Sequence, residues 1–389
     1  MMKKPIAILM FFLMAGCIAG FTASAEEIPQ EDLLKRIQKL EESRQVLPDG
    51  WMKRVSISGA LEAEAGFTST DFADPALKDT DESDAALSTM ALDMDAEINN
   101  HVSGHILFLW EEDGTGPVDL DEGVITVHGG DASPFYLSAG KMYVPFGHFE
   151  SHMISDPLTH ELAETRESAI QAGVDSEGVY GSVYAFNGDM DEDGKDNNID
   201  NFGGNAGVIM EKDDFCLDIG CCWINNILDS DGGFDIFAQK AETAEALGVS
   251  SALRGYVPGA GAHAVVSCGP VSLIGEYIAA LEKPEWNITD AVPGSMAALN
   301  LDAVEKGGKY AAYHLELGCT RSICGRTTTF AVGAQGTGDM ENFLPERRFL
   351  GSVGVCIFRQ TTLALEYCHD KYDNDDEADV VTTRLAVAF

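Results

Sequence analysis

The stretch VSISGALEAEAGF, residues 55–67, alternates apolar and polar side chains along its length. A second stretch, MALDMDAEI at residues 90–98, repeats the alternation with acidic groups on its polar face. A period of two indicates β-strands. A soluble sandwich would bury the apolar face in a core, whereas a transmembrane barrel would turn it toward lipid and the polar face toward a wet lumen. The alternation alone leaves both folds open.

The connections between strands separate the two folds. Tight turns, such as those at 99–100, 175–177, 269–270 and 359–360, alternate with long acidic connections near 68–85, 143–167, 188–204, 226–259 and 282–308. Short turns on one side and long loops on the other are typical of outer-membrane barrels. We therefore predict an all-β fold, a 16-stranded antiparallel transmembrane β-barrel. Its strands are expected near 55–67, 86–98, 102–112, 118–128, 134–142, 168–175, 178–187, 205–212, 215–225, 260–268, 271–281, 309–319, 325–337, 349–358, 361–369 and 379–389.

The two ends of the chain support this prediction. The sequence finishes in VVTTRLAVAF, residues 380–389, an alternating strand with a terminal aromatic residue that resembles the C-terminal strand of outer-membrane barrels. Residues 1–25 carry two lysines, an apolar run and Ala23-Ser24-Ala25, which predicts a secretory signal peptide. Residues 26–50 predict a short periplasmic helix or coiled coil, either self-associating or a loose tether, and residues 51–389 the barrel. A further helix is expected at 237–247.

Composition excludes several classes of protein. The 389 residues carry a net charge of −39, which argues against a nucleic-acid partner. The mean hydropathy of −0.04 argues against a helical membrane protein. We find no nucleophile elbow, phosphate loop or complete zinc-protease motif, and we predict no enzyme. Among the cysteines, Cys319 and Cys324 flank a turn and form either a local disulfide or two half-buried thiols.

Two blocks of sequence carry a family resemblance. GKMYVPFGHFESHMISDPLTHELAETRESAIQAG (140–173) and FNGDMDEDGKDNNIDNFGGNAG (186–207) resemble the LbtU family of outer-membrane siderophore porins, as does the short coiled coil that precedes the barrel. The resemblance extends over the whole mature chain. It implies a 16-stranded barrel that passes a siderophore or its ferric complex.

The first block coincides with the third long connection, which commonly folds inward in 16-stranded porins. An inward loop would place charges of both signs at a pore constriction, where selectivity is set. An ordinary charged surface loop is the alternative interpretation. The candidate constriction residues are Glu150, Asp156, Glu161, Glu164, Arg166 and Glu167.

The second block contains a calcium-loop pattern, DMDEDG followed by five residues and an aspartate. Strands replace the helices that usually flank such a loop, so an unliganded acidic loop is the alternative. The candidate Ca²⁺ ligands are Asp189, Asp191, Asp193, the Lys195 carbonyl, Asn197 and Asp200. His148, Glu150, His152 and His160 also lie close in sequence, and exposed loop histidines are favoured there over a transition-metal site.

Together these observations predict a porin-like channel of the bacterial outer membrane, with a small solute and membrane lipid as its partners. The solute suggested by the resemblance is a siderophore or ferric siderophore. The alternatives are a general cation-preferring diffusion porin and a non-transporting, calcium-stabilised surface barrel or adhesin. A homo-oligomer could form through the N-terminal helix.

Overall fold

The computed structural model describes residues 54–112, 118–130, 133–190, 192–194, 198–234, 236, 249–290, 304–340 and 342–389. The chain divides into residues 1–56 and a barrel unit of residues 57–389. The predicted signal peptide, the predicted periplasmic helix and the helix expected at 237–247 lie outside the described residues. Within the described part, no helix has both the length and the apolar character needed to cross a membrane.

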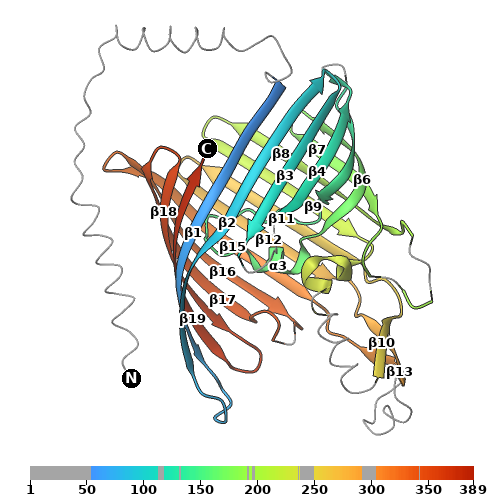
Figure 1. The fold of residues 1–389 in the computed structure, drawn as a ribbon, viewed down its shortest axis with the longest axis vertical. Coiled ribbons are helices and arrows are strands. Elements are labelled where there is room, and N and C mark those ends of the chain that lie inside the picture. Colours follow the sequence, from blue (N-terminus) through green and yellow to red (C-terminus); the bar gives the residue numbers. More distant parts are fainter. Residues whose placement is uncertain are drawn as a thin grey trace. The chain divides into compact units, whose positions relative to one another are not determined.

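Sixteen antiparallel strands close into a barrel, as predicted (Figure 1). Each strand pairs with its neighbours along the chain, and β1 closes the ring against β19, with Ala60 opposite Ala388. The barrel strands are β1 (Val55–Asp71), β2 (Thr80–Asn99), β3 (Val102–Glu111), β4 (Asp119–His128), β5 (Phe135–Tyr143), β6 (Arg166–Ser176), β7 (Val179–Phe186), β8 (Asn201–Lys212), β9 (Phe215–Ile224), β11 (Gly259–Cys268), β12 (Val271–Ala280), β15 (Ala311–Ile323), β16 (Arg326–Gly338), β17 (Arg347–Phe358), β18 (Thr361–Lys371) and β19 (Glu377–Ala388).

The alternation in sequence becomes an alternation of environment in space. On β15, Tyr313, Leu315 and Leu317 are 41–51% exposed. The residues between them, His314 and Glu316, are 2% and 0% exposed. Apolar side chains therefore cover the outside of the barrel, where lipid can solvate them, and polar side chains face inward.

A three-stranded sheet in the long connections was not predicted. It joins β10 (Val249–Leu253), β13 (Glu285–Asp290) and β14 (Val304–Lys306), with β13 in the centre. These strands have three to six residues and pair across large distances in sequence. Strands of this length are too short to show a recognisable alternation of apolar and polar residues. They are stabilised by pairing with strands that are distant in sequence.

The structure also corrects the suggestion of a local disulfide. Cys319 and Cys324 are free thiols, as are the other cysteines between Cys216 and Cys368. Cys319 lies on β15, while Cys324 has a positive φ of 52° in the turn between β15 and β16.

Candidate functional site: the third connection inside the barrel

The connection between β5 and β6, residues 144–165, lies against the inner face of the barrel and is held there by strand carboxylates. Glu276 of β12 is the first anchor. Its Oε1 accepts a hydrogen bond of 2.6 Å from the His148 backbone N–H. Its Oε2 accepts bonds of 3.3 Å from the Phe149 N–H and 2.7 Å from the Thr159 hydroxyl. One carboxylate thus fixes both the outgoing and the returning arm of the connection.

Glu316 of β15 is the second anchor. It accepts hydrogen bonds from the Ser151 hydroxyl at 2.7 Å and from the His152 N–H at 2.9 Å. The His152 ring lies 2.8 Å from the Ser272 hydroxyl of β12. This part of the connection therefore follows the inner wall from one strand to the next.

Glu366 of β18 is the third anchor. It accepts a 2.5 Å bond from the Ile154 N–H, a 3.1 Å bond from the Ser155 N–H, and a further bond from the Ser155 hydroxyl. On the adjacent strand β19, the Arg384 guanidinium donates to the Ile154 carbonyl at 2.9 Å. The connection therefore reaches as far as the strands that close the barrel.

The three anchoring glutamates are buried beneath the connection, with exposures of 7%, 0% and 1%. A buried carboxylate is costly unless its oxygens accept hydrogen bonds. Here the N–H and hydroxyl groups of the connection donate these hydrogen bonds to the carboxylates. The same contacts give the backbone N–H groups of the connection their acceptors. Charge-assisted bonds of this kind each stabilise by about 1.5–3 kcal/mol.

A short helix, α3 (Leu158–Ala163), forms on the returning arm. Leu158, Thr159, Leu162 and Ala163 are buried against the barrel wall, and the Leu158 N–H donates to Gln335 of β16 at 2.9 Å. Because an α-helix has 3.6 residues per turn, a helix that buries these positions places residues 160, 161 and 164 on its opposite face, away from the barrel wall. The polar face of α3 therefore looks into the lumen.

Of the predicted constriction residues, Glu161 and Glu164 lie on this polar face, and Asp156 precedes the helix. Asp156 and Glu161 are exposed to the lumen, and Glu164 pairs with His160 at 2.7 Å. Glu150 lies nearer the start of the connection, with its side chain 46% exposed and its Oε2 3.4 Å from His148 Nε2. All four of these acidic side chains are thus at least partly exposed.

Two loop groups have shifted pKa values. Burial lowers the pKa of His160, but the hydrogen bond and charge of Glu164, with Asp156 and Glu161, outweigh it and raise the value to about 9. Enclosure by the barrel, together with the charge of Asp156, raises the pKa of Glu161. His160 is therefore a cation at neutral pH.

The two remaining predicted residues lie at the start of β6. Arg166 forms an ion pair with Asp121 of β4, whose side chain is 1% exposed. Asp156, Glu164 and Arg166 all lie within electrostatic range of Glu111 on β3. The third connection and the strands β3 and β4 therefore present charges to a common space. Glu111 and Asp121 were missed because nothing in the sequence distinguishes them from other polar lumen residues.

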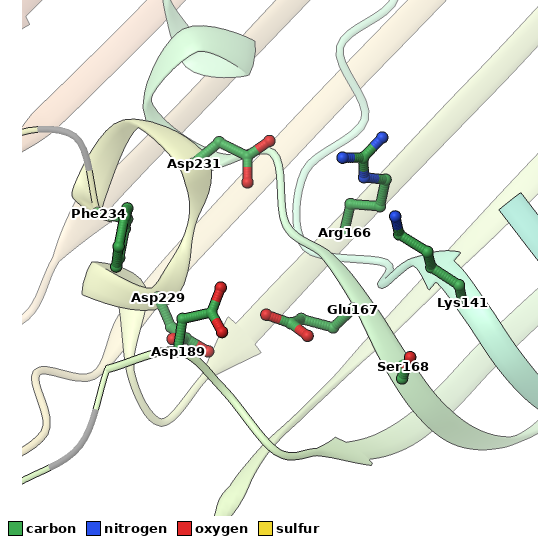
Figure 2. Close-up of a pocket in the computed structure, with 8 residues that line it drawn as sticks. All are labelled: Lys141, Arg166, Glu167, Ser168, Asp189, Asp229, Asp231 and Phe234. Carbon is green, nitrogen blue, oxygen red and sulfur yellow. The ribbon is translucent and has the colours of Figure 1, made fainter. Parts of the chain in front are cut away.

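Glu167 faces a cavity of about 320 Å³ (Figure 2). The cavity brings together the beginning of β6, the end of β5 and two long connections. Figure 2 shows the cationic ends of Lys141 and Arg166 on one side and carboxylates on the other. Its lining residues are Lys141, Arg166, Glu167, Ser168, Asp189, Asp229, Asp231 and Phe234.

The predicted calcium ligands are only partly described. Asp189 lines the cavity of Figure 2. Asp193 accepts a 2.9 Å hydrogen bond from Asn287 of β13, and Asp200 accepts one of 2.8 Å from the Tyr256 hydroxyl. Asp191, Lys195 and Asn197 lie outside the described residues. The calcium site stays a prediction.

Comparisons with known proteins agree on the barrel. The outer-membrane channel DcaP of Acinetobacter baumannii aligns with a TM-score of 0.55 at 14% identity, over 86% of this chain and 97% of that one. OprB of Pseudomonas putida aligns with a TM-score of 0.58 at 10% identity, over 90% and 97%. These similarities establish a porin fold, and the chain is a barrel of the bacterial outer membrane.

Sequence relatives carry no named function. A UPF0422 protein of Coxiella burnetii is 28% identical over 347 residues, which is 87% of this chain and 69% of that protein. A UPF0422 protein of Legionella pneumophila (strain Lens) is 28% identical over 339 residues, and the match spans 82% of this chain and 59% of that protein. No family model matches the chain. The resemblance to the LbtU family is not confirmed and stays a prediction.

Proposed function

We propose that this barrel is a solute channel whose third connection narrows the lumen and selects what passes. The support is the set of three strand carboxylates that hold residues 148–159 on the inner wall. A loop bound at three separate strands cannot swing freely out of the lumen. Its acidic groups then occupy fixed positions beside the route of a solute.

The balance of charge along this route favours cations. Two inward-facing arginines of the described strands are already paired: Arg348 with Asp370 at 2.8 Å, and Arg384 with Glu64 at 2.7 Å and Glu62 at 3.1 Å. Asp156 and Glu161 are exposed side chains of the connection that lies inside the barrel. An excess of negative charge raises the local concentration of cations and repels anions. A cation-preferring diffusion channel is therefore the function that the geometry supports most directly.

Passage of a siderophore or ferric siderophore is the more specific proposal. It is supported by the resemblance of residues 140–173 and 186–207 to siderophore porins. The acidic lining restricts the charge of the siderophore, because it would repel a polycarboxylate siderophore with a net negative charge. The proposed solute is therefore a siderophore complex whose net charge is zero or positive.

Planar bilayers test the channel itself. The purified protein should conduct, and under a tenfold KCl gradient its reversal potential should have the sign of cation preference. A protein that inserts without conducting would rule out the channel and support the non-transporting barrel or adhesin. An anion-selective pore would contradict the charge argument while leaving a channel in place.

Uptake by a deletion strain separates the two solute classes. Loss of labelled ferric-siderophore uptake, with normal permeation of other small cations, would support the siderophore channel. Normal siderophore uptake with a general loss of small cationic solutes would support the diffusion porin. Complementation with the intact gene is the control.

A further inference from the structure

Two imidazoles and a carboxylate meet where the third connection first reaches the barrel wall. His148 belongs to the connection, Asp218 to β9 and His263 to β11. One ligand atom from each lies within 4.8 Å of the other two. We propose that these residues bind one divalent transition-metal ion of the zinc class, which links the connection to the wall.

The chemistry and spacing suit such an ion. Zinc-type ions bind imidazole nitrogen and carboxylate oxygen at about 2.0–2.2 Å, so two ligand atoms of a tetrahedral site lie roughly 3.4 Å apart. His263 Nε2 and Asp218 Oδ1 are 3.5 Å apart. Two histidines and a carboxylate also form a common three-ligand set, with the fourth position left to water.

Neighbouring groups provide space and support for the ligands. A cavity of about 210 Å³ lies beside the three residues, and Tyr180 and Cys222 also line it. The Tyr180 hydroxyl donates to Asp218 Oδ1 at 3.0 Å and lies 3.2 Å from His263 Nε2. Outer hydrogen bonds of this kind orient metal ligands. Tyr180 would hold the Asp218 carboxylate beside His263 Nε2, and both ligand atoms would then bind the ion from their present positions.

His148 must move for the ion to bind. The rings of His148 and His263 are stacked, with centroids 4.1 Å apart and planes 12° from parallel. Nearly parallel rings cannot point two lone pairs at one ion, so one ring has to rotate. The His148 side chain is 29% exposed, whereas that of His263 is 10% exposed. The bond from the His148 N–H to Glu276 fixes the backbone, and rotation of the side chain alone suffices.

A second cluster offers a matched control. His105 Nδ1 lies 2.9 Å from Asp95 and 3.6 Å from Asp93, and its Nε2 lies 3.9 Å from Glu122. This cluster has a single imidazole among three carboxylates and lacks the second nitrogen ligand of the His148 cluster. Removing its ring should leave transition-metal binding at the His148 cluster unchanged.

The test is metal binding by the full-length protein, refolded in detergent and stripped with chelator. Excess Ca²⁺ in the buffer occupies any calcium loop. Co²⁺ titration, followed by visible absorption, should show one tight equivalent that Zn²⁺ displaces. His263→Ala and Asp218→Asn should each weaken binding by at least about 100-fold, and Tyr180→Phe by about 10-fold. His105→Gln should bind as the wild type does.

Two results would overturn the proposal. In the first, the wild-type protein binds no stoichiometric Co²⁺. In the second, His105→Gln loses Co²⁺ binding while His263→Ala keeps it. Heat-modifiable migration on gels shows which variants have folded, and His148→Gln provides a second, loop-side ligand variant. Binding is measured without any current. Failure of the metal site and failure of the channel function are therefore distinguishable.

Discussion

Glu366 of β18 and Ile154 of the third connection, 212 residues apart in sequence, are joined by a 2.5 Å hydrogen bond from the Ile154 N–H to the carboxylate. The neighbouring Ser155 donates to the same carboxylate through its N–H and its hydroxyl. This contact fixes the part of the loop farthest from its ends in sequence. It also ties the loop to the strands that close the barrel.

Removing this anchor should loosen the loop while leaving the barrel intact. In Glu366→Ala the Ile154 and Ser155 N–H groups lose their partner, at a cost of about 1–3 kcal/mol for each unsatisfied group. We expect higher single-channel conductance with more current noise, and a smaller effect in Glu366→Gln, which keeps one acceptor. Glu377→Ala, whose side chain is 48% exposed, is the control. Wild-type conductance and noise in a folded Glu366→Ala variant would contradict the anchoring role.

The acidic groups of the loop should set the preference for cations. Asp156→Asn combined with Glu161→Gln removes two carboxylates that face the lumen. We expect the reversal potential in a KCl gradient to shift toward zero, with little change in stability because exposed charges contribute little to it. Glu177→Gln, in the turn between β6 and β7, is the matched control. An unchanged reversal potential in the double variant would place the selectivity elsewhere.

The preference for cations should also change with pH in the alkaline range, because His160 loses its proton there. Its pKa is raised from 6.5 to about 9, so the pairing with Glu164 stabilises the loop fully below about pH 6.5 and is lost as pH rises through about 9. Loss of the imidazolium charge leaves Glu164 uncompensated. Cation preference should therefore increase between pH 7.5 and 9.5, measured as reversal potential.

The matched control for the pH effect is His160→Gln, which cannot titrate in this range. Its pH profile should be flatter than that of the wild type, and at pH 7.5 its cation preference should already be greater. Identical profiles for the two proteins would assign the pH effect to other groups.

One glycine should be essential for closing the barrel. Gly140 of β5 has a φ of 145°, and a Cβ at this position would lie 2.0 Å from the Gly123 carbonyl oxygen on β4. Gly140→Ala therefore forces these strands apart, a backbone strain of at least about 1–3 kcal/mol. We expect a large loss of heat-modifiable, folded protein. Gly351→Ala on β17, where an added Cβ meets nothing within 4 Å, should fold normally; equal folding of both variants would contradict this strain.

The sequence determined the barrel because each spanning strand must alternate between lipid and water. Residues 55–67 and 90–98 display this alternation locally, and the tight turns between strands are equally local signals. All sixteen expected strands correspond to barrel strands, but β2 begins at Thr80 rather than near residue 86. Where a strand extends beyond the membrane, lipid no longer requires every second side chain to be apolar. The ends of such strands are therefore harder to locate from the sequence.

Only the tertiary structure decided how the lumen is organised. Charges in residues 150–167 indicated a candidate constriction, but the anchors Glu276, Glu316 and Glu366 lie on strands more than a hundred residues away. In sequence each resembles any other polar residue of an alternating strand. Their role arises when ring closure brings the strands opposite the loop, and hydrogen bonding in a buried setting makes that arrangement specific. The His148, Asp218 and His263 cluster arises in the same way, from one loop and two strands.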